Sequence, residues 1–472
     1  MTIPKKTVFS LANLKYSVLS QILVIIFGVI RAIAIPAYLG VTDFGYWQVY
    51  LLYVGFVGVL SLGFNDGIYL RYGGINQNDL PWSLLRSSFV YYLMTLCLLS
   101  LFFLVILQQT EINHNKYLSL TYVIINITLV GCSSLFLFIF QTTNQIKKYS
   151  VYILIDKIIF ILVLAIMLVF DGLDFESLMI LDCTTKLLLV IIMLVDCREF
   201  IVGKYSSYSD GFFEFCRNLS VGIKLMLANL ASMLVLAISR FFLEEFYTIE
   251  EFSMYSFGIT LTNLVLLAVS GVSVMLYPAL KQLKEDRYKA AYISLSELTS
   301  LFLAISIGAY FPIYYFIFNW MPDYSQVLDY FNVLFVLMLF QVKQQLVINT
   351  FYKTLRKENA MLIANIVCVV LTIALSIFVV FYSKTVTMVA LALLLTIIYR
   401  VYQSDRYLRG LLAIKSQLII TKEIILFVLF IILTNTVSIQ ISLLIYITFI
   451  MPYLFSARFK IKRLYMGLKD FK

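Results

Sequence analysis

Residues 31–71 read RAIAIPAYLGVTDFGYWQVYLLYVGFVGVLSLGFNDGIYLR, two long apolar runs joined by a short turn. Arg31 lies inside the first run, and Asp66 and Arg71 close the second. Ionisable groups in membrane helices are costly, so they usually face a cavity or a partner and are functional-site candidates by default. The stretch therefore predicts a membrane hairpin that carries candidate functional residues.

The composition of the whole chain supports this prediction. The chain has 472 residues, of which 62% are hydrophobic and only 13% are charged. A soluble fold of this length could not hide so much apolar surface. The apolar residues also come in runs of about twenty, the length of a helix that crosses a bilayer. We expect an all-α polytopic membrane protein with no nucleic-acid partner, and we assign the net charge of +10 to membrane topology.

Hydropathy predicts fourteen transmembrane spans with short connections. The spans are 15–39, 47–64, 84–107, 118–140, 151–170, 177–195, 218–243, 254–279, 292–319, 328–350, 360–382, 385–403, 417–435 and 437–456. If the N-terminus is cytoplasmic, the outer loops carry only Lys116 and Lys384 as cations and are otherwise acidic. This alternation follows the positive-inside rule, so it predicts that both termini are cytoplasmic.

The two halves of the chain show a weak internal repeat. When residues 31–52 are laid on residues 240–260, Arg31 meets Arg240, and after a one-residue slip Asp43 meets Glu251. Parallel repeats of this kind are typical of transporters, with the substrate site between the halves. We predict an N-terminal six-helix bundle over residues 1–200 and a C-terminal six-helix bundle over residues 201–410. Two additional helices and a basic tail follow over residues 411–472.

Two regions carry a family resemblance. They are YLGVTDFGYWQVY (38–50) with LGFNDGIYLRYGG (62–74), and the segment 221–280 at the start of the second half. The chain resembles the O-antigen flippases (Wzx type) of the multidrug/oligosaccharidyl-lipid/polysaccharide exporters. The resemblance implies two six-helix bundles around a central cavity in the bacterial inner membrane. It also implies flipping of undecaprenyl-pyrophosphate-linked oligosaccharide to the outer leaflet, driven by a proton or sodium ion, with contact to polysaccharide polymerase and chain-length machinery.

Intramembrane cations are the candidate contacts for an anionic lipid-linked substrate, because a pyrophosphate prefers cations. Arg31 lies about 12 Å below the outer end of its span at ~1.5 Å per residue, where it either snorkels or faces a cavity. Lys186 lies in mid-span with Asp182 four residues earlier, which allows a structural pair or a cation lining the substrate path. Arg240 has Glu244 four residues later, which allows a surface pair as well.

Polar residues of the second half add three candidates. Lys343 and Gln344 belong to the cluster QVKQQ, which we expect to face water as a cytoplasmic entry site, with snorkelling of the lysine as the alternative. Asn229 could hydrogen-bond sugar hydroxyls or only a neighbouring helix.

The energy source is not visible in the sequence. The chain contains no GxxxxGK[ST] loop, its single histidine, His114, has no catalytic partners, and its six cysteines show no metal-type spacing. We expect no enzyme activity, cofactor or metal. The candidate residues for ion coupling or gating are Asp66, Asp156, Asp182 and Arg71.

Three other functions remain open. A multidrug-type cation antiporter of the same fold requires a deep carboxylate without a cationic partner. A glycan polymerase or ligase requires a large outer loop with catalytic polar residues, and the predicted outer loops are short. A structural scaffold or a lipid scramblase is the remaining alternative.

Overall fold

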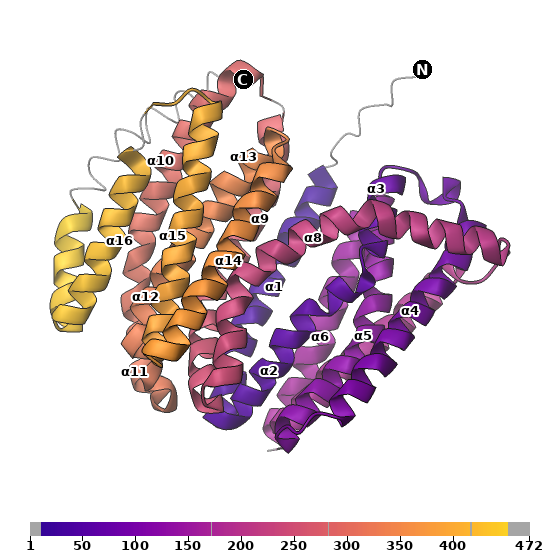
Figure 1. Cartoon of the computed structure of the whole chain (residues 1–472), viewed down its shortest axis with the longest axis horizontal. Helices are drawn as coiled ribbons and strands as arrows, with labels where there is room; N and C mark the ends of the chain where they lie inside the picture. The colour runs from indigo at the N-terminus through magenta and orange to yellow at the C-terminus, as the bar shows by residue number, and fades with distance from the viewer. Residues whose placement is uncertain (1–10, 171, 282, 416–417, 452–472) are drawn as a thin grey trace. The chain divides into compact units, whose positions relative to one another are not determined.

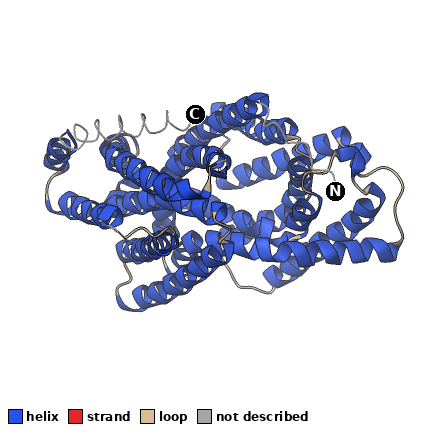
Figure 2. Ribbon diagram, turned by 90° about the horizontal axis from the view of Figure 1, so that it is seen from above, coloured by secondary structure: helices blue, strands red, loops and turns tan. Residues whose placement is uncertain are grey.

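The protein is described by a computed structural model covering residues 11–170, 172–281, 283–415 and 418–451. Every regular element of these residues is helical, and they contain no strand (Figure 2). Eleven of their helices are long and apolar enough to cross a membrane, and two shorter apolar helices accompany them. The expectation of an all-α polytopic membrane protein is confirmed, whereas the total of fourteen crossings stays a prediction. The basic tail beyond residue 451 lies outside the described residues.

The first compact unit comprises residues 1–230. Its helices are α1 (Leu11–Tyr38), α2 (Val41–Val57), α3 (Phe64–Tyr72), α4 (Trp82–Gln108), α5 (His114–Thr142), α6 (Ile146–Val169) and α7 (Phe175–Asp196), followed by the first part of α8 (Tyr208–Phe246) (Figure 1). Helix α5 is the centre of the unit, because it packs against α2, α3, α4, α6 and α7.

A sharp break separates α2 from α3. A short 3₁₀ turn over Gly58–Ser61 leads into Leu62 and Gly63, which have φ angles of 51° and 85°. Glycine adopts this left-handed conformation without steric cost. The break ends the predicted second span and starts α3 at Phe64, so that Asp66 lies in the first turn of a separate helix.

The second compact unit comprises residues 231–472. After the rest of α8 its helices are α9 (Ile249–Lys281), α10 (Tyr288–Ser306), α11 (Tyr310–Trp320), α12 (Leu328–Lys343), α13 (Asn349–Thr354), α14 (Glu358–Tyr382), α15 (Val386–Leu411) and α16 (Leu418–Thr436). Helix α12 is its centre and packs against α9, α10, α15 and α16. A π-helical turn over Gln344–Ile348 continues α12 into α13, and such turns occur often at functional sites.

The division between the units falls inside α8, after residue 230. The predicted repeats with boundaries at residues 200 and 410 stay a prediction about the origin of the chain. One detail agrees with that prediction. The matched acids Asp43 and Glu251 both lie in the first turn of a helix, α2 in the first unit and α9 in the second.

Candidate functional site

Five polar side chains gather in the interior of the first unit. We call them the N-unit polar cluster: Arg31 of α1, Tyr50 of α2, Asn126 of α5, and Asp182 and Lys186 of α7. The Tyr50 hydroxyl and the Lys186 ammonium both donate to Asp182 Oδ2. Asn126 Nδ2 donates to the Tyr50 hydroxyl at 2.8 Å. The structure thus joins three of the predicted site residues, and the Asp182–Lys186 pair suggested by their spacing is present.

The positions of these residues follow from local helix geometry. Asp182 and Lys186 are four residues apart on α7, so that their side chains lie on one face. Helix α7 is fixed at its start by a reciprocal capping box between Asp174 and Ser177. Asn126 is fully buried near the middle of α5, which faces both α2 and α7. Burial of polar groups is costly without hydrogen bonds, so the cluster is a constrained network.

Arg31 gives the cluster an excess of positive charge. Its guanidinium lies 5.0 Å from the ring centre of Trp47 and 4.8 Å from that of Phe160. It is close enough to Asp182 to interact electrostatically, yet its buried Nη2 has no hydrogen-bond partner among the described residues. One carboxylate is therefore paired with Lys186 and lies in the electrostatic reach of a second cation, Arg31. This arrangement leaves guanidinium donors for an anionic group.

The Tyr50 hydroxyl links α2, α5 and α7. Replacing Tyr50 with phenylalanine is expected to lower stability by about 1–3 kcal/mol, because Asp182 loses a donor and Asn126 loses an acceptor in a buried place. Thermal unfolding of the purified protein in detergent measures the loss. Tyr38→Phe is the matched control, since this tyrosine is 57% exposed. Equal melting temperatures for the two variants would contradict the network described above.

Arg71 forms a hydrogen-bonded network with α8, and its part in gating stays a prediction. Its Nη1 and Nη2 donate to Glu214 Oε1 and Oε2 at 2.5 and 3.0 Å, and Nη1 also donates to Asn218 Oδ1 at 2.6 Å. The Tyr72 hydroxyl donates to Glu214 Oε1 at 2.7 Å. Burial, strengthened by this carboxylate, raises the pKa of Tyr72 to about 12, so the hydroxyl stays protonated. We call this network the α3–α8 clasp, because it ties α3 to the first part of α8.

The other two candidate acids of the first unit differ in their surroundings. Asp66 is buried in the first turn of α3, and burial raises the pKa of its carboxyl, opposed by a hydrogen bond from its own backbone. Asp156 forms an ion pair of 2.7 Å with Lys157, whose side chain is 38% exposed. A raised pKa suits a group that exchanges protons, so Asp66 is the stronger coupling candidate.

The second unit corrects one expectation. Lys343 is fully buried and forms an ion pair with Glu423 of α16, so the prediction that it faces water is wrong in this structure. Gln344 is buried as well, and its Nε2 donates to Asn349 Oδ1 at 3.0 Å. Lys343 and Gln344 are buried because α10, α15 and α16 pack around α12 and the π turn that follows it. Contact of Lys343 and Gln344 with the substrate stays a prediction.

Two further candidates lie on α8. Arg240 Nε donates to Ser256 Oγ at 3.3 Å, and the guanidinium lies 5.5 Å from the ring centre of Phe252. Arg31 and Arg240 therefore each lie over one aromatic ring of the following helix, Trp47 of α2 and Phe252 of α9. Asn229 is exposed, which leaves its amide accessible.

Sequence reasoning missed the partners of these residues. Tyr50 was one of 33 tyrosines and carried no distinguishing signal. Glu214 lies outside the predicted seventh span. Glu423, by contrast, is the only acid in the predicted span 417–435. An acid in an apolar span indicates a functional site or a partner, so the sequence could have singled it out.

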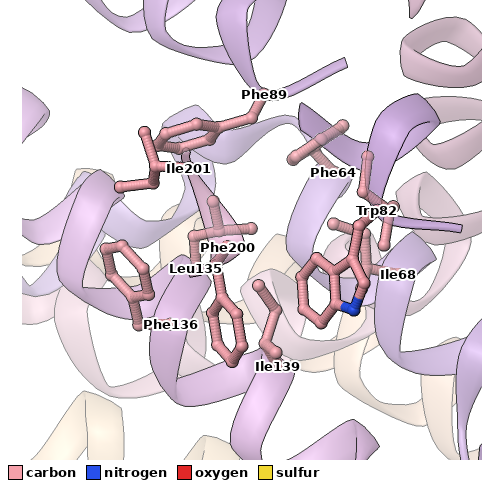
Figure 3. Close-up of a pocket in the computed structure, with 10 residues that line it drawn as sticks. Phe64, Ile68, Trp82, Phe89, Leu135, Phe136, Ile139, Phe200 and Ile201 are labelled. Carbon is pink, nitrogen blue, oxygen red and sulfur yellow. The ribbon is translucent and has the colours of Figure 1, made fainter. Parts of the chain in front are cut away.

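A small pocket of the first unit is a different kind of site. It is lined by apolar side chains of α3, α4, α5 and the segment after α7, among them Phe64, Leu135 and Ile139 (Figure 3). Trp82 and Phe200 also line the pocket, and their rings stack with centres 4.4 Å apart. No charged side chain lines this pocket, so it does not suit a pyrophosphate.

The fold and the cluster define a multi-pass α-helical membrane protein with a cationic polar network inside one helical bundle. No described protein family and no curated protein matches the sequence. Solved structures do match. The lipid II flippase MurJ, in an inward closed conformation, superposes with a TM-score of 0.63 at 16% identity over 96% of this chain and 100% of that chain.

Two other solved structures are transporters of the MOP superfamily. An inward-facing multidrug resistance MATE family transporter of the MOP superfamily gives a TM-score of 0.58 at 12% identity, covering 83% of this chain and 100% of its own. A MOP superfamily transporter from Pyrococcus furiosus gives 0.51 at 12% identity, covering 86% and 95%. The chain therefore has the fold shared by MOP-superfamily transporters.

Proposed function

We propose that this protein is a flippase for undecaprenyl-pyrophosphate-linked oligosaccharide repeat units of a bacterial surface polysaccharide, such as O-antigen. It moves them by alternating access from the cytoplasmic to the outer leaflet of the inner membrane, with both termini cytoplasmic. The observation that carries the proposal is the N-unit polar cluster. There, Arg31 and Lys186 outnumber Asp182 in an apolar bundle, and cations are what a pyrophosphate group requires. The fold shared with a lipid II flippase is consistent with this substrate class.

The main alternative is a multidrug-type cation antiporter, which the MATE structures favour by fold. Such a protein needs a deep carboxylate that is free to bind an organic cation. The described residues include five buried acids: Asp66, Asp182, Glu214, Asp405 and Glu423. All but Asp66 form an ion pair with a lysine or arginine. Asp66, the exception, lies in the first turn of α3, beyond the break that ends the predicted second span, so it is not a deep carboxylate. The charge arrangement therefore favours an anionic substrate.

Ion coupling is part of the proposal. Asp182 is engaged by Lys186 and Tyr50, and Asp156 by its neighbour Lys157. Asp66 is buried without such a cation, and its pKa is raised by burial. We therefore assign proton or sodium coupling first to Asp66, with Arg71 holding the adjacent helices together.

Deletion of the gene is expected to abolish the surface polysaccharide, while lipid-linked repeat units accumulate on the cytoplasmic face of the membrane. The lipid-linked oligosaccharides are extracted and quantified by mass spectrometry, and a periplasmic glycosidase or lectin reports which leaflet they occupy. Normal surface glycan in a strain without a second flippase would overturn the proposal. Lost resistance to organic cations with normal glycan would instead favour the antiporter.

A further inference from the structure

The second unit contains a buried arginine that the proposed function does not use. Arg400 of α15 is only 2% exposed, and its Nε has no hydrogen-bond partner among the described residues. It lies close enough to Tyr352 and Cys368 to interact electrostatically with both. Neither of these groups carries a negative charge at neutral pH under ordinary conditions. A buried guanidinium normally has a counter-ion, because an unpaired buried charge is strongly unfavourable.

The acids among the described residues do not supply that counter-ion. The described residues include every acidic residue except Asp171 and Asp470. No described acid forms an ion pair with Arg400. Asp405, the acid nearest to it in sequence, accepts from Arg409 Nε and from the Tyr292 hydroxyl, both at 2.6 Å. Glu423 is paired with Lys343. The two buried ion pairs are neutral, so Arg400 leaves this group of buried side chains with an excess of one positive charge.

The register of α14 against α15 puts a second unsatisfied polar side chain at the level of Arg400. Asn365 of α14 is 1% exposed, and neither its Nδ2 nor its Oδ1 has a partner. Helices α14 and α15 form an antiparallel hairpin, in which Thr372 Oγ1 lies 3.2 Å from Thr396 Oγ1 and Cys368 Sγ 3.8 Å from the Thr396 carbonyl. Asn365 lies one turn before Cys368 on α14, and Arg400 lies one turn after Thr396 on α15. Because the two helices are antiparallel, both residues are displaced toward the same end of the hairpin.

We propose that Arg400 and Asn365 form a buried binding site for a small monovalent anion, with chloride as the physiological ion. The guanidinium supplies the charge, and the amide Nδ2 supplies a second N–H donor. Buried polar groups without partners call for such an explanation. A single-atom anion needs only a few N–H donors, whereas a phosphate presents four oxygens that these two side chains cannot satisfy. The inference is independent of the transported substrate, since it concerns the packing of one unit.

The test uses the purified full-length protein. Thermal unfolding is followed while chloride replaces gluconate at constant ionic strength. The wild-type melting temperature is expected to rise by about 1–3 °C and then saturate. Arg400→Gln is expected to abolish the rise, and Arg406→Gln, an exposed arginine of the same helix, is expected to keep it. Asn365→Leu is expected to weaken the apparent chloride affinity about fivefold.

Bromide locates the ion directly. In crystals grown in bromide, an anomalous peak is expected beside Arg400 and Asn365. This peak tests the anion site on the wild-type protein, so the test does not depend on whether Arg400→Gln folds. A melting temperature independent of chloride would overturn the proposal, as would a chloride effect that persists in Arg400→Gln. Equal stabilisation by inorganic phosphate would overturn the assignment to a single-atom anion.

Discussion

Replacing Lys186 with methionine is expected to destabilise the protein, whereas the double change Asp182→Asn/Lys186→Met is expected to restore stability and still lack transport. The single change leaves the Asp182 carboxylate in a buried network without its ion-pair partner, which typically costs about 3–5 kcal/mol. The double change removes both charges and keeps an acceptor for the Tyr50 hydroxyl. Thermal unfolding and export of lipid-linked repeat units are measured for both variants.

The expected loss of export in the double variant follows from the substrate charge. A charge-assisted hydrogen bond to the pyrophosphate contributes about 1.5–3 kcal/mol, or roughly 10- to 150-fold in affinity. Arg31→Ala is expected to cause a similar loss with little change in protein level, because no carboxylate lies within ion-pair distance of Arg31 among the described residues. Lys204→Met, at an exposed lysine, is the control. Wild-type export by the stable double variant would show that Lys186 only neutralises Asp182.

Adding one methyl group to Gly67 or Gly222, where α3 packs against α8, is expected to disrupt the first unit. A Cβ on Gly67 would lie 2.0 Å from the Asn218 carbonyl oxygen, and one on Gly222 would lie 1.9 Å from the Gly63 carbonyl oxygen. Both obstacles are backbone atoms, which cannot rotate away. The two helices must therefore separate, and the bidentate pair of Arg71 with Glu214 is strained or broken as a result.

The size of this effect comes from two sources. Overpacking typically costs about 1–3 kcal/mol for each clash, and weakening of the Arg71–Glu214 pair adds to that cost. Gly67→Ala and Gly222→Ala are expected to yield little folded protein by fluorescence-detected size exclusion. Gly55→Ala is the matched control, because a Cβ on Gly55 in α2 meets no atom within 4 Å and alanine is the better helix former. Wild-type yield from Gly222→Ala would mean that α3 and α8 do not pack as described.

Spacing along one helix was enough to predict part of the candidate site. The four-residue interval between Asp182 and Lys186 predicts their pairing, and the structure contains that pair. Partners on distant helices could not be predicted in this way. Glu423 is 80 residues from Lys343, and apolar runs with similar hydropathy do not indicate which helix faces which. The prediction that Lys343 faces water is wrong for that reason. A cluster of polar residues on one helix predicts a water-facing surface, and only the neighbouring helices show that it is covered.

The sequence by itself determined the all-helical, membrane-spanning class of this protein, because the length and apolarity of each span are local properties that backbone hydrogen bonding in lipid converts into helices. It also predicted that residues 31–71 hold two apolar runs with charges at costly positions, and the structure ends the second run at a break, beyond which Asp66 and Arg71 lie on α3. Only the tertiary structure decided what those charges do. Arg31 joins a network with α2, α5 and α7, and Arg71 holds Glu214 of α8. The physical reason is that a buried charge is stabilised by the side chain that meets it in space, and packing of the helices chooses that side chain.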